Sequence, residues 1–257
     1  MLRLVEGRRG RFLADSSDSY VGRSLIKYGE YNEEQAAFLC DHIKEGDIVA
    51  DVGANIGAHT VAMASKAQRV IAFEPQRRIY NILCANVALN ELDRSVRPMR
   101  LAVGEQRVAE YEIDVLDYMN EDNNYGAFSM ETKVGGDVVG IVPLEQPVSL
   151  IKIDVQGWEL KVLIGAQAMI RRNRPIIYCE NDQPENSDSL LSLLRDAGYR
   201  CYWHITPLFT DQNFRGETEN IYGREHSFDM ICYPDKRDCP LAEVKYGKHP
   251  LKNDHTN

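Results

Sequence analysis

The amino-acid sequence predicts an α/β fold, in which helices cover both faces of a doubly wound and mostly parallel β-sheet. From residue 33 onward, segments with helical periodicity alternate with short β-branched runs, the pattern of parallel strands joined by helices. The run at 48–52 reads as a buried strand. A glycine-containing turn at 53–57 then joins this strand to a helical segment, as in α/β proteins that bind ligands at their sheet edge.

Composition narrows the class of protein. The 257 residues are 44% apolar and 27% charged, which is typical of a soluble globular chain with one large core. No run approaches the ~18 apolar residues of a membrane span, and charge interrupts residues 1–9, so we expect a cytoplasmic protein with no membrane partner. A net charge of −9 would repel phosphate backbones, so nucleic acid is not an expected partner. The six cysteines form no CxxC pair, which favours reduced thiols.

The first half of the predicted sheet alternates regularly with helices. Strands are predicted at 48–52, 69–74 and 96–103, and helices at 33–45, 57–66 and 75–90. Gly46 stops the first helix, and Pro75 stands where a proline opens the next one. Pro98 lacks an N–H group, so the third strand should lie at a sheet edge.

An insertion follows at about 104–140. Its residues 110–115 alternate in polarity with a period of two, which indicates a strand with one wet face, and residues 117–136 should form a long loop. Further strands are predicted at 148–154, 175–180, 199–205 and 228–233, with helices at 159–170 and 190–197. We therefore divide the chain into an N-terminal segment and helix (1–45) that pack on the ligand site, a main domain (46–234) and a tail (235–257) of little pattern.

The turn after the first strand has features of a cofactor site. Its glycines let the backbone approach a ligand, but the spacing Gly53-x-x-x-Gly57 is not the G-x-G-x-x-G of pyrophosphate sites. Asp51 would repel a diphosphate and suits a cationic amino-acid group. Glu74 ends the next strand near the ~20-residue offset at which a carboxylate reaches ribose hydroxyls. Helix capping and packing are the alternative roles of each residue taken alone.

Together these residues predict a ribosyl ligand that is positively charged and lacks phosphates, as S-adenosylmethionine is. The predicted cofactor-binding residues are Asp51, Gly53, Ala54, Asn55, Gly57, Glu74 and Ala102.

Four sequence blocks resemble the FkbM-type class I methyltransferases. They are Asp-Val-Gly-Ala-Asn-Ile-Gly at 51–57, Ala-Phe-Glu-Pro at 72–75, Ile-Lys-Ile-Asp-Val-Gln-Gly-Trp-Glu at 151–159 and Gly-Ala at 165–166. The resemblance extends over about residues 20–234. It implies a Rossmann-like, seven-stranded sheet with an antiparallel final strand, S-adenosylmethionine as cofactor, and usually O-methylation of a sugar or natural-product hydroxyl. The family more often has Glu where this chain has Gln156.

Methyl transfer requires an acceptor oxygen ~3–3.5 Å from the methyl carbon and a group that takes its proton. Asp154 is the first choice as base or as orienter of the acceptor, and Lys152 points to the same side of its strand. Capping of the following helix is the alternative role of Asp154. His204 completes the predicted catalytic set, with a packed histidine as the alternative. The segments 123–129 and 207–227 are candidate lids or ordinary loops.

Several alternatives stay open. The oxygen ligands of Asp154, Glu180 and Asn181 are of the type that Mg²⁺ prefers, and a magnesium-assisted reaction is the less favoured version of the chemistry. N- or C-methylation and a non-catalytic S-adenosylmethionine-binding protein are the other hypotheses. A nicotinamide enzyme is disfavoured by the glycine spacing.

Overall fold

The computed structural model describes residues 1–113, 137–236 and 239–253, and its centre is a seven-stranded β-sheet. In spatial order the sheet contains β11 (Arg200–Pro207), β12 (His226–Tyr233), β10 (Ile176–Glu180), β9 (Leu150–Ile153), β3 (Ile48–Val52), β4 (Arg69–Phe73) and β5 (Val96–Met99). Strand β12 is antiparallel to both of its neighbours, and the other adjacent pairs are parallel. This confirms the predicted fold class, including the antiparallel final strand.

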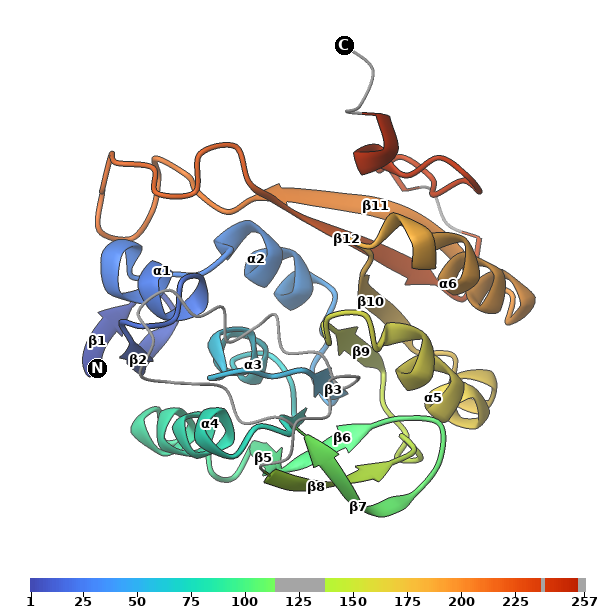
Figure 1. Ribbon diagram of the computed structural model, residues 1–257, viewed down its shortest axis with the longest axis horizontal. Helices are drawn as coiled ribbons and strands as arrows, with labels where there is room; N and C mark the ends of the chain where they lie inside the picture. The colour runs from blue at the N-terminus through green and yellow to red at the C-terminus, as the bar shows by residue number, and fades with distance from the viewer. Residues whose placement is uncertain (114–136, 237–238, 254–257) are drawn as a thin grey trace.

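In the described part of the chain, five helices cover the two faces of this sheet. Figure 1 shows α2 (Glu33–Asp41), α3 (Ala58–Ala64) and α4 (Arg77–Leu89) on one side, with α5 (Glu159–Asn173) and α6 (Pro184–Asp196) on the other. Successive side chains of a strand point to opposite faces of the sheet and pack in different helix layers. Val49 belongs to the core cluster with α2, α3 and α4, and Ala50 to the cluster with α5 and α6. Apolar residues at successive positions are therefore needed in these strands.

The strand order reverses at β3. It pairs with β4 on one side and with β9 on the other, and the helices that follow β3 and β9 lie on opposite faces. Such a reversal leaves a crevice beyond the carboxyl ends of the strands, where ligands of open α/β sheets bind.

Element boundaries differ from the prediction where local signals are weak. The helix predicted at 33–45 ends at Asp41, and the one predicted to begin at residue 190 begins at Pro184. The strand predicted at 96–103 is interrupted after Met99: β5 lies at the sheet edge, as Pro98 indicated, and β6 (Leu101–Val103) joins another sheet.

The predicted insertion contains that second sheet. Strand β8 (Asp137–Val142) lies between β6 and β7 (Val108–Ile113), and this three-stranded sheet packs on the face that α5 covers. The predicted loop at 117–136 lies outside the described residues.

The N-terminal hairpin was not predicted. Strands β1 (Leu2–Gly7) and β2 (Gly10–Asp15) pair antiparallel, and α1 (Val21–Tyr28) packs against them. Side-chain amides of Asn86 and Asn90 on and after α4 hydrogen-bond to the backbone of β2, so tertiary contacts fix a hairpin whose Leu2 and Leu4 stay exposed.

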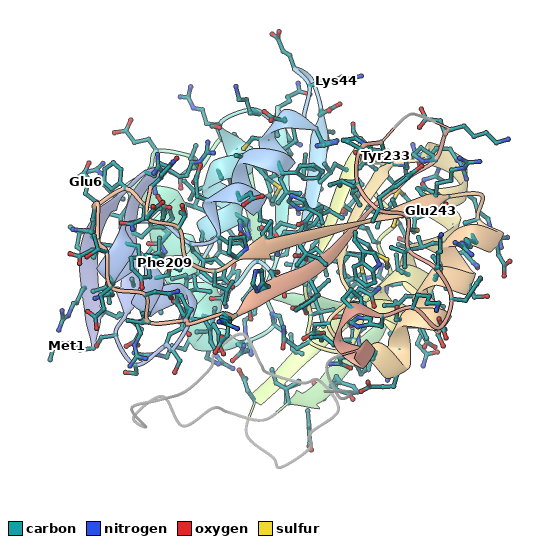
Figure 2. All side chains as sticks on the ribbon, turned by 90° about the horizontal axis from the view of Figure 1, so that it is seen from above. Met1, Glu6, Lys44, Phe209, Tyr233 and Glu243 are labelled. Atoms are coloured by element: carbon teal, nitrogen blue, oxygen red, sulfur yellow. The ribbon has the colours of Figure 1, made fainter. Side chains whose placement is uncertain are left out.

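Two later segments complete the molecule. Residues after Pro207 pack on the N-terminal unit, which consists of β1, β2 and α1. Figure 2 shows Phe209 on the same side as Met1 and Glu6, and Arg215 donates to the Glu6 carbonyl oxygen. The C-terminal residues run beside β11, where Val244 N–H donates to the Cys201 carbonyl oxygen. A 3-10 helix, η1 (Pro250–Asn253), follows. Within the described part of the chain, no helix is long and apolar enough to span a membrane.

Candidate active site

A cavity of about 680 Å³ lies at the carboxyl ends of β3, β4, β9 and β10. The turn after β3, the end of β4, strand β6 and the residues after β9 form its floor and one wall. The lining also includes Tyr20, Tyr31 and residues 224–228. Of the predicted cofactor residues, the lining includes Gly53, Ala54, Asn55, Glu74 and Ala102.

The turn after β3 is held by the protein itself. The N–H groups of Gly53 and Ala54 both donate to the Phe73 carbonyl oxygen, at 3.0 and 2.9 Å. Gly53 has φ +80, and a Cβ atom there would lie 1.8 Å from the Asp154 carbonyl oxygen. Glycine at this position is thus required by the close approach of two backbone segments as well as by any ligand.

Gly57 has a purely structural environment. It has φ +91 and caps α3, and a Cβ atom would lie 2.7 Å from Leu83 Cδ1. Gly57 is not among the residues that line the cavity in the described structure. Packing and capping account for a glycine here, and its assignment to the cofactor set stays a prediction.

Glu74 stands at the cavity wall, at the tip of β4. Its side chain is 4% exposed, and its two carboxylate oxygens accept hydrogen bonds from the N–H groups of Asn55 and Gln76, at 3.0 and 2.9 Å. Burial raises the pKa of Glu74 to about 7, although the backbone N–H groups favour the charged form. The carboxylate is thus fixed in direction with unused lone pairs.

Asp51 lies beneath the turn. It is fully buried, accepts a hydrogen bond from Thr60 Oγ1 at 2.6 Å and lies 3.3 Å from Lys152 Nζ. Among the described residues that line the cavity, Asp51 does not appear. The Asp51 carboxylate faces α3 and β9 in the described structure, and its role toward a cationic ligand group stays a prediction.

Lys152 connects Asp51 to the cavity. Its ammonium group lies 3.3 Å from carboxylate oxygens of both Asp51 and Asp154, and its side chain is 2% exposed. Burial alone would lower the pKa of Lys152, but Asp154 and Asp51 raise it above its ordinary value. The lysine stays protonated, so it can orient Asp154 but cannot accept a proton.

Asp154 begins an acidic rim that continues across Glu180 and Asp182. The side chain of Asp154 is 30% exposed. Next along the rim, Gln156 Nε2 donates to both carboxylate oxygens of Glu180, at 3.0 and 2.9 Å. Burial raises the pKa of Glu180 well above its usual range, and the neighbouring Asp154 and Asp182 raise it further. A neutral amide at position 156 thus stabilises a carboxyl group that another acid would repel.

The third weak metal candidate, Asn181, points elsewhere. It is buried, and its amide nitrogen donates to Ser187 Oγ at 3.0 Å. Within the described ranges, no group of three or more His, Cys, Asp or Glu side chains has an arrangement that could hold a metal ion.

His204 lies in the β11 layer and does not line the cavity as far as the structure describes it. Its Nδ1 lies 2.7 Å from the Tyr178 hydroxyl oxygen, and its ring stacks on Phe38 with centroids 3.9 Å apart. Burial lowers the pKa of His204 to about 4. These contacts match the packed alternative, and the catalytic assignment of His204 stays a prediction.

Sequence reasoning did not identify His59. It is the second residue of α3, is 5% exposed and lines the cavity, and its Nε2 has no hydrogen-bond partner among the described residues. Burial lowers the pKa of His59 to about 4, so it is neutral at pH 7. Its position directly after the Gly57 turn was the one available signal.

The candidate lid at 207–227 is bound to the N-terminal unit. The Tyr222 hydroxyl donates to the Tyr20 carbonyl oxygen at 2.8 Å, the two rings stack, and the Tyr28 hydroxyl donates to the Glu219 carbonyl oxygen. The segment thus forms a cavity wall with Tyr20. The other candidate lid, at 123–129, lies outside the described residues.

Comparisons with known proteins bear on this site. The family profile described as "Methyltransferase FkbM domain" matches residues 51–201. The "Hexuronic acid methyltransferase AglP" of Haloferax volcanii is 27% identical over 83% of this chain and 87% of its own length. Wild-type Trm5b from Pyrococcus abyssi has a similar fold, with a TM-score of 0.52 at 13% identity over 90% of this chain and 55% of Trm5b. A crystal structure titled "Methyltransferase FkbM" from Methylobacillus flagellatus KT superimposes with a TM-score of 0.46 at 18% identity, covering 73% of this chain and 44% of that one.

Proposed function

The chain belongs to the FkbM family of S-adenosylmethionine-dependent methyltransferases, and we propose that it methylates a hydroxyl group of a sugar or glycan. The supporting relative acts on a hexuronic acid by its name and aligns over most of both chains. A free sugar, a glycan and a glycosylated natural product all present such hydroxyl groups, so the proposal is limited to this acceptor class.

The chemistry of the cavity suits the cofactor. Among the described lining residues, the Lys and Arg side chains are Lys152 and Arg224, whereas five side chains are carboxylic: Glu74, Asp154, Glu180, Asp182 and Glu225. S-adenosylmethionine supplies an electrophilic methyl carbon on a positively charged sulfur, and an acidic cavity favours a cationic ligand. The volume of about 680 Å³ falls in the usual range for small-molecule sites.

We propose Glu74 as the residue that binds the ribose hydroxyls. Each of its oxygens already accepts one backbone N–H group, and a carboxylate has about four acceptor positions, which leaves capacity for two hydroxyl donors. Phe73, Ala102 and Trp158 provide an apolar wall beside it for an adenine ring. Asn55 and Ala54 contribute the backbone of the turn.

Asp154 is the proposed acceptor-side carboxylate. It is partly exposed on the cavity rim, and Lys152 holds one of its oxygens at 3.3 Å. The other oxygen can accept the hydrogen of an acceptor hydroxyl, which aligns the oxygen lone pair for in-line attack and takes the proton as the new bond forms. Lys152 acts as a positioning residue through Asp154.

The observation that carries the proposal is the family match over the segment that builds both the turn and Asp154. The test is incubation of the purified protein with S-adenosylmethionine labelled in its methyl group and a panel of hexuronic acid glycosides and neutral glycosides. Mass spectrometry should locate the label on a sugar oxygen. Label on nitrogen or carbon would refute O-methylation, and an EDTA arm that abolished activity reversibly would assign a metal to this rim.

The remaining parts of the proposal concern the cellular location and the partners of the protein. We propose a cytoplasmic location because all six cysteines are free in the structure, as a reducing compartment requires. The net charge of −9 supports a small or glycosidic acceptor over nucleic acid.

A further inference from the structure

Arg224 is a cavity-lining cation with no carboxylate partner among the residues that the structure describes. Its exposed guanidinium group has no hydrogen bond or ion pair with any residue that the structure describes. The adjacent Glu225 lies near the Tyr20 hydroxyl, whose pKa is raised by burial and by this carboxylate. An arginine on a cavity wall, with five N–H donors that no described residue accepts from, is equipped to bind an anionic group of a ligand.

The backbone around Arg224 is firmly held. The Asn220 amide donates to the Gly223 carbonyl oxygen at 2.6 Å, and the Glu225 N–H donates to the Tyr222 carbonyl oxygen at 3.0 Å. Leu208 N–H closes the segment by donating to the Glu225 carbonyl oxygen. These bonds place the base of the Arg224 side chain at a defined point of the wall.

The charges of the other lining residues disfavour binding of an anionic ligand group elsewhere in the cavity. Lys152, the other basic lining group with a fixed charge, is 2% exposed and is shared between Asp51 and Asp154. Elsewhere, carboxylic groups at Glu74, Asp154 and Asp182 would repel a negative charge. Among the described lining residues, Arg224 is therefore the Lys or Arg side chain that is available to neutralise an anionic ligand group.

We propose that Arg224 binds the carboxylate of an acidic sugar acceptor and thereby selects hexuronates over neutral hexoses. This inference rests on the proposed function and names the substrate class of the same site. Guanidinium and carboxylate groups form two parallel hydrogen bonds, which would fix the sugar in direction as well as in place. The anion would be anchored at the wall while a ring hydroxyl lies toward Asp154.

The test compares acceptors that differ only at carbon 6. For the wild type, Arg224→Gln, Arg224→Lys and Arg171→Gln, kcat/KM is measured with the 4-nitrophenyl glycosides of glucuronic acid and glucose, and of galacturonic acid and galactose. Binding of the same glycosides to the S-adenosylhomocysteine-loaded protein is measured in parallel. Arg171 is exposed in the last turn of α5 and does not line the cavity, so it is the matched loss of one positive charge.

The wild type should prefer a uronide, and Arg224→Gln should lower the uronide-to-hexoside ratio of kcat/KM about 10- to 100-fold, chiefly through KM. Arg224→Lys should restore part of that ratio, and Arg171→Gln should leave it unchanged. If hexosides are methylated and the ratio is the same in wild type and Arg224→Gln, the inference is wrong while the proposed function stands. If no glycoside is methylated but uronides bind through Arg224, the proposed function fails while the inference stands. Absence of uronide binding to the loaded wild type overturns the inference.

Discussion

Asp51 Oδ1 and Lys152 Nζ lie 3.3 Å apart in the core, one from each of the two central strands, and both side chains are almost fully buried. The residues are direct register partners of β3 and β9. This pair joins the two strands at the switch point and orients the rim carboxylate Asp154 from below. A buried charge pair of this kind makes each partner costly to remove alone.

Replacement of Lys152 by methionine should therefore destabilise the fold. The variant leaves the Asp51 carboxylate buried without its cation, so we expect a loss of about 3 to 5 kcal/mol in the free energy of unfolding. Urea denaturation measures this loss. The double variant Asp51→Asn/Lys152→Met should lose less than the two single variants summed, because both charges are gone. Strict additivity would show that the two charges do not interact.

Gly53→Ala should be much more harmful than Gly46→Ala. Both glycines have positive φ, +80 and +89, but a Cβ atom at Gly53 meets the Asp154 carbonyl oxygen at 1.8 Å, whereas at Gly46 no atom of the described residues lies within 4 Å. We expect Gly46→Ala to cost about 1 kcal/mol and Gly53→Ala about 3 kcal/mol or more, measured by thermal and urea denaturation. Equal costs would mean that backbone conformation alone requires the glycine.

Glu74→Gln should weaken cofactor binding. The amide keeps the shape of the side chain but loses a charged acceptor, so the Kd of S-adenosylhomocysteine should rise about 10- to 100-fold by calorimetry. Glu105→Gln, an exposed substitution outside the cavity, is the control. An unchanged Kd would remove Glu74 from the cofactor site.

Asp154→Asn should separate catalysis from cofactor binding. Loss of the acceptor-side carboxylate should lower kcat by about 100-fold or more, while the Kd of S-adenosylhomocysteine changes by only a few-fold. Asp182→Asn, on the same rim, should lower kcat less. Equal losses in the two variants would mean that the rim acts through its total charge.

Glu159 should make stability depend on pH. The residue is 3% exposed, its carboxylate accepts hydrogen bonds from the N–H groups of Val155 and Gly157, and burial raises its pKa to about 7. Because the pKa of this carboxyl group is higher in the folded state, the folded protein keeps its proton to a higher pH than the unfolded chain. The free energy of unfolding therefore falls as pH rises from about 4.5 to 7. Glu159→Gln should gain stability relative to the wild type as pH rises from 5 to 8, by thermal denaturation. Glu34→Gln, an exposed substitution, should show no such trend.

The sequence predicts best what short-range patterns encode. The strand at 48–52, the glycine turn and the next strand up to Glu74 were all predictable, because burial on both faces requires continuous apolar runs and tight turns require glycine. The antiparallel final strand came from the family resemblance, and the structure confirms it.

Other features depend on contacts that span long stretches of sequence. The direction of Asp51 follows from which face of β3 carries its side chain, and only Thr60 and Lys152 reveal it. The N-terminal hairpin exposes leucines and depends on amides of α4, so no periodicity marks it. Arg224 lies in a segment with no repeat pattern, and its place on the cavity wall appears only when Tyr222 meets Tyr20.

That last contact joins residues 202 positions apart in the chain. During synthesis, the ribosome releases Tyr20 early, but its partner emerges only after most of the sheet has been made. The nascent protein can assemble the turn that holds Glu74 long before the wall that carries Arg224 exists. During synthesis of each molecule, the residues that bind the cofactor should thus be assembled before those that recognise the acceptor.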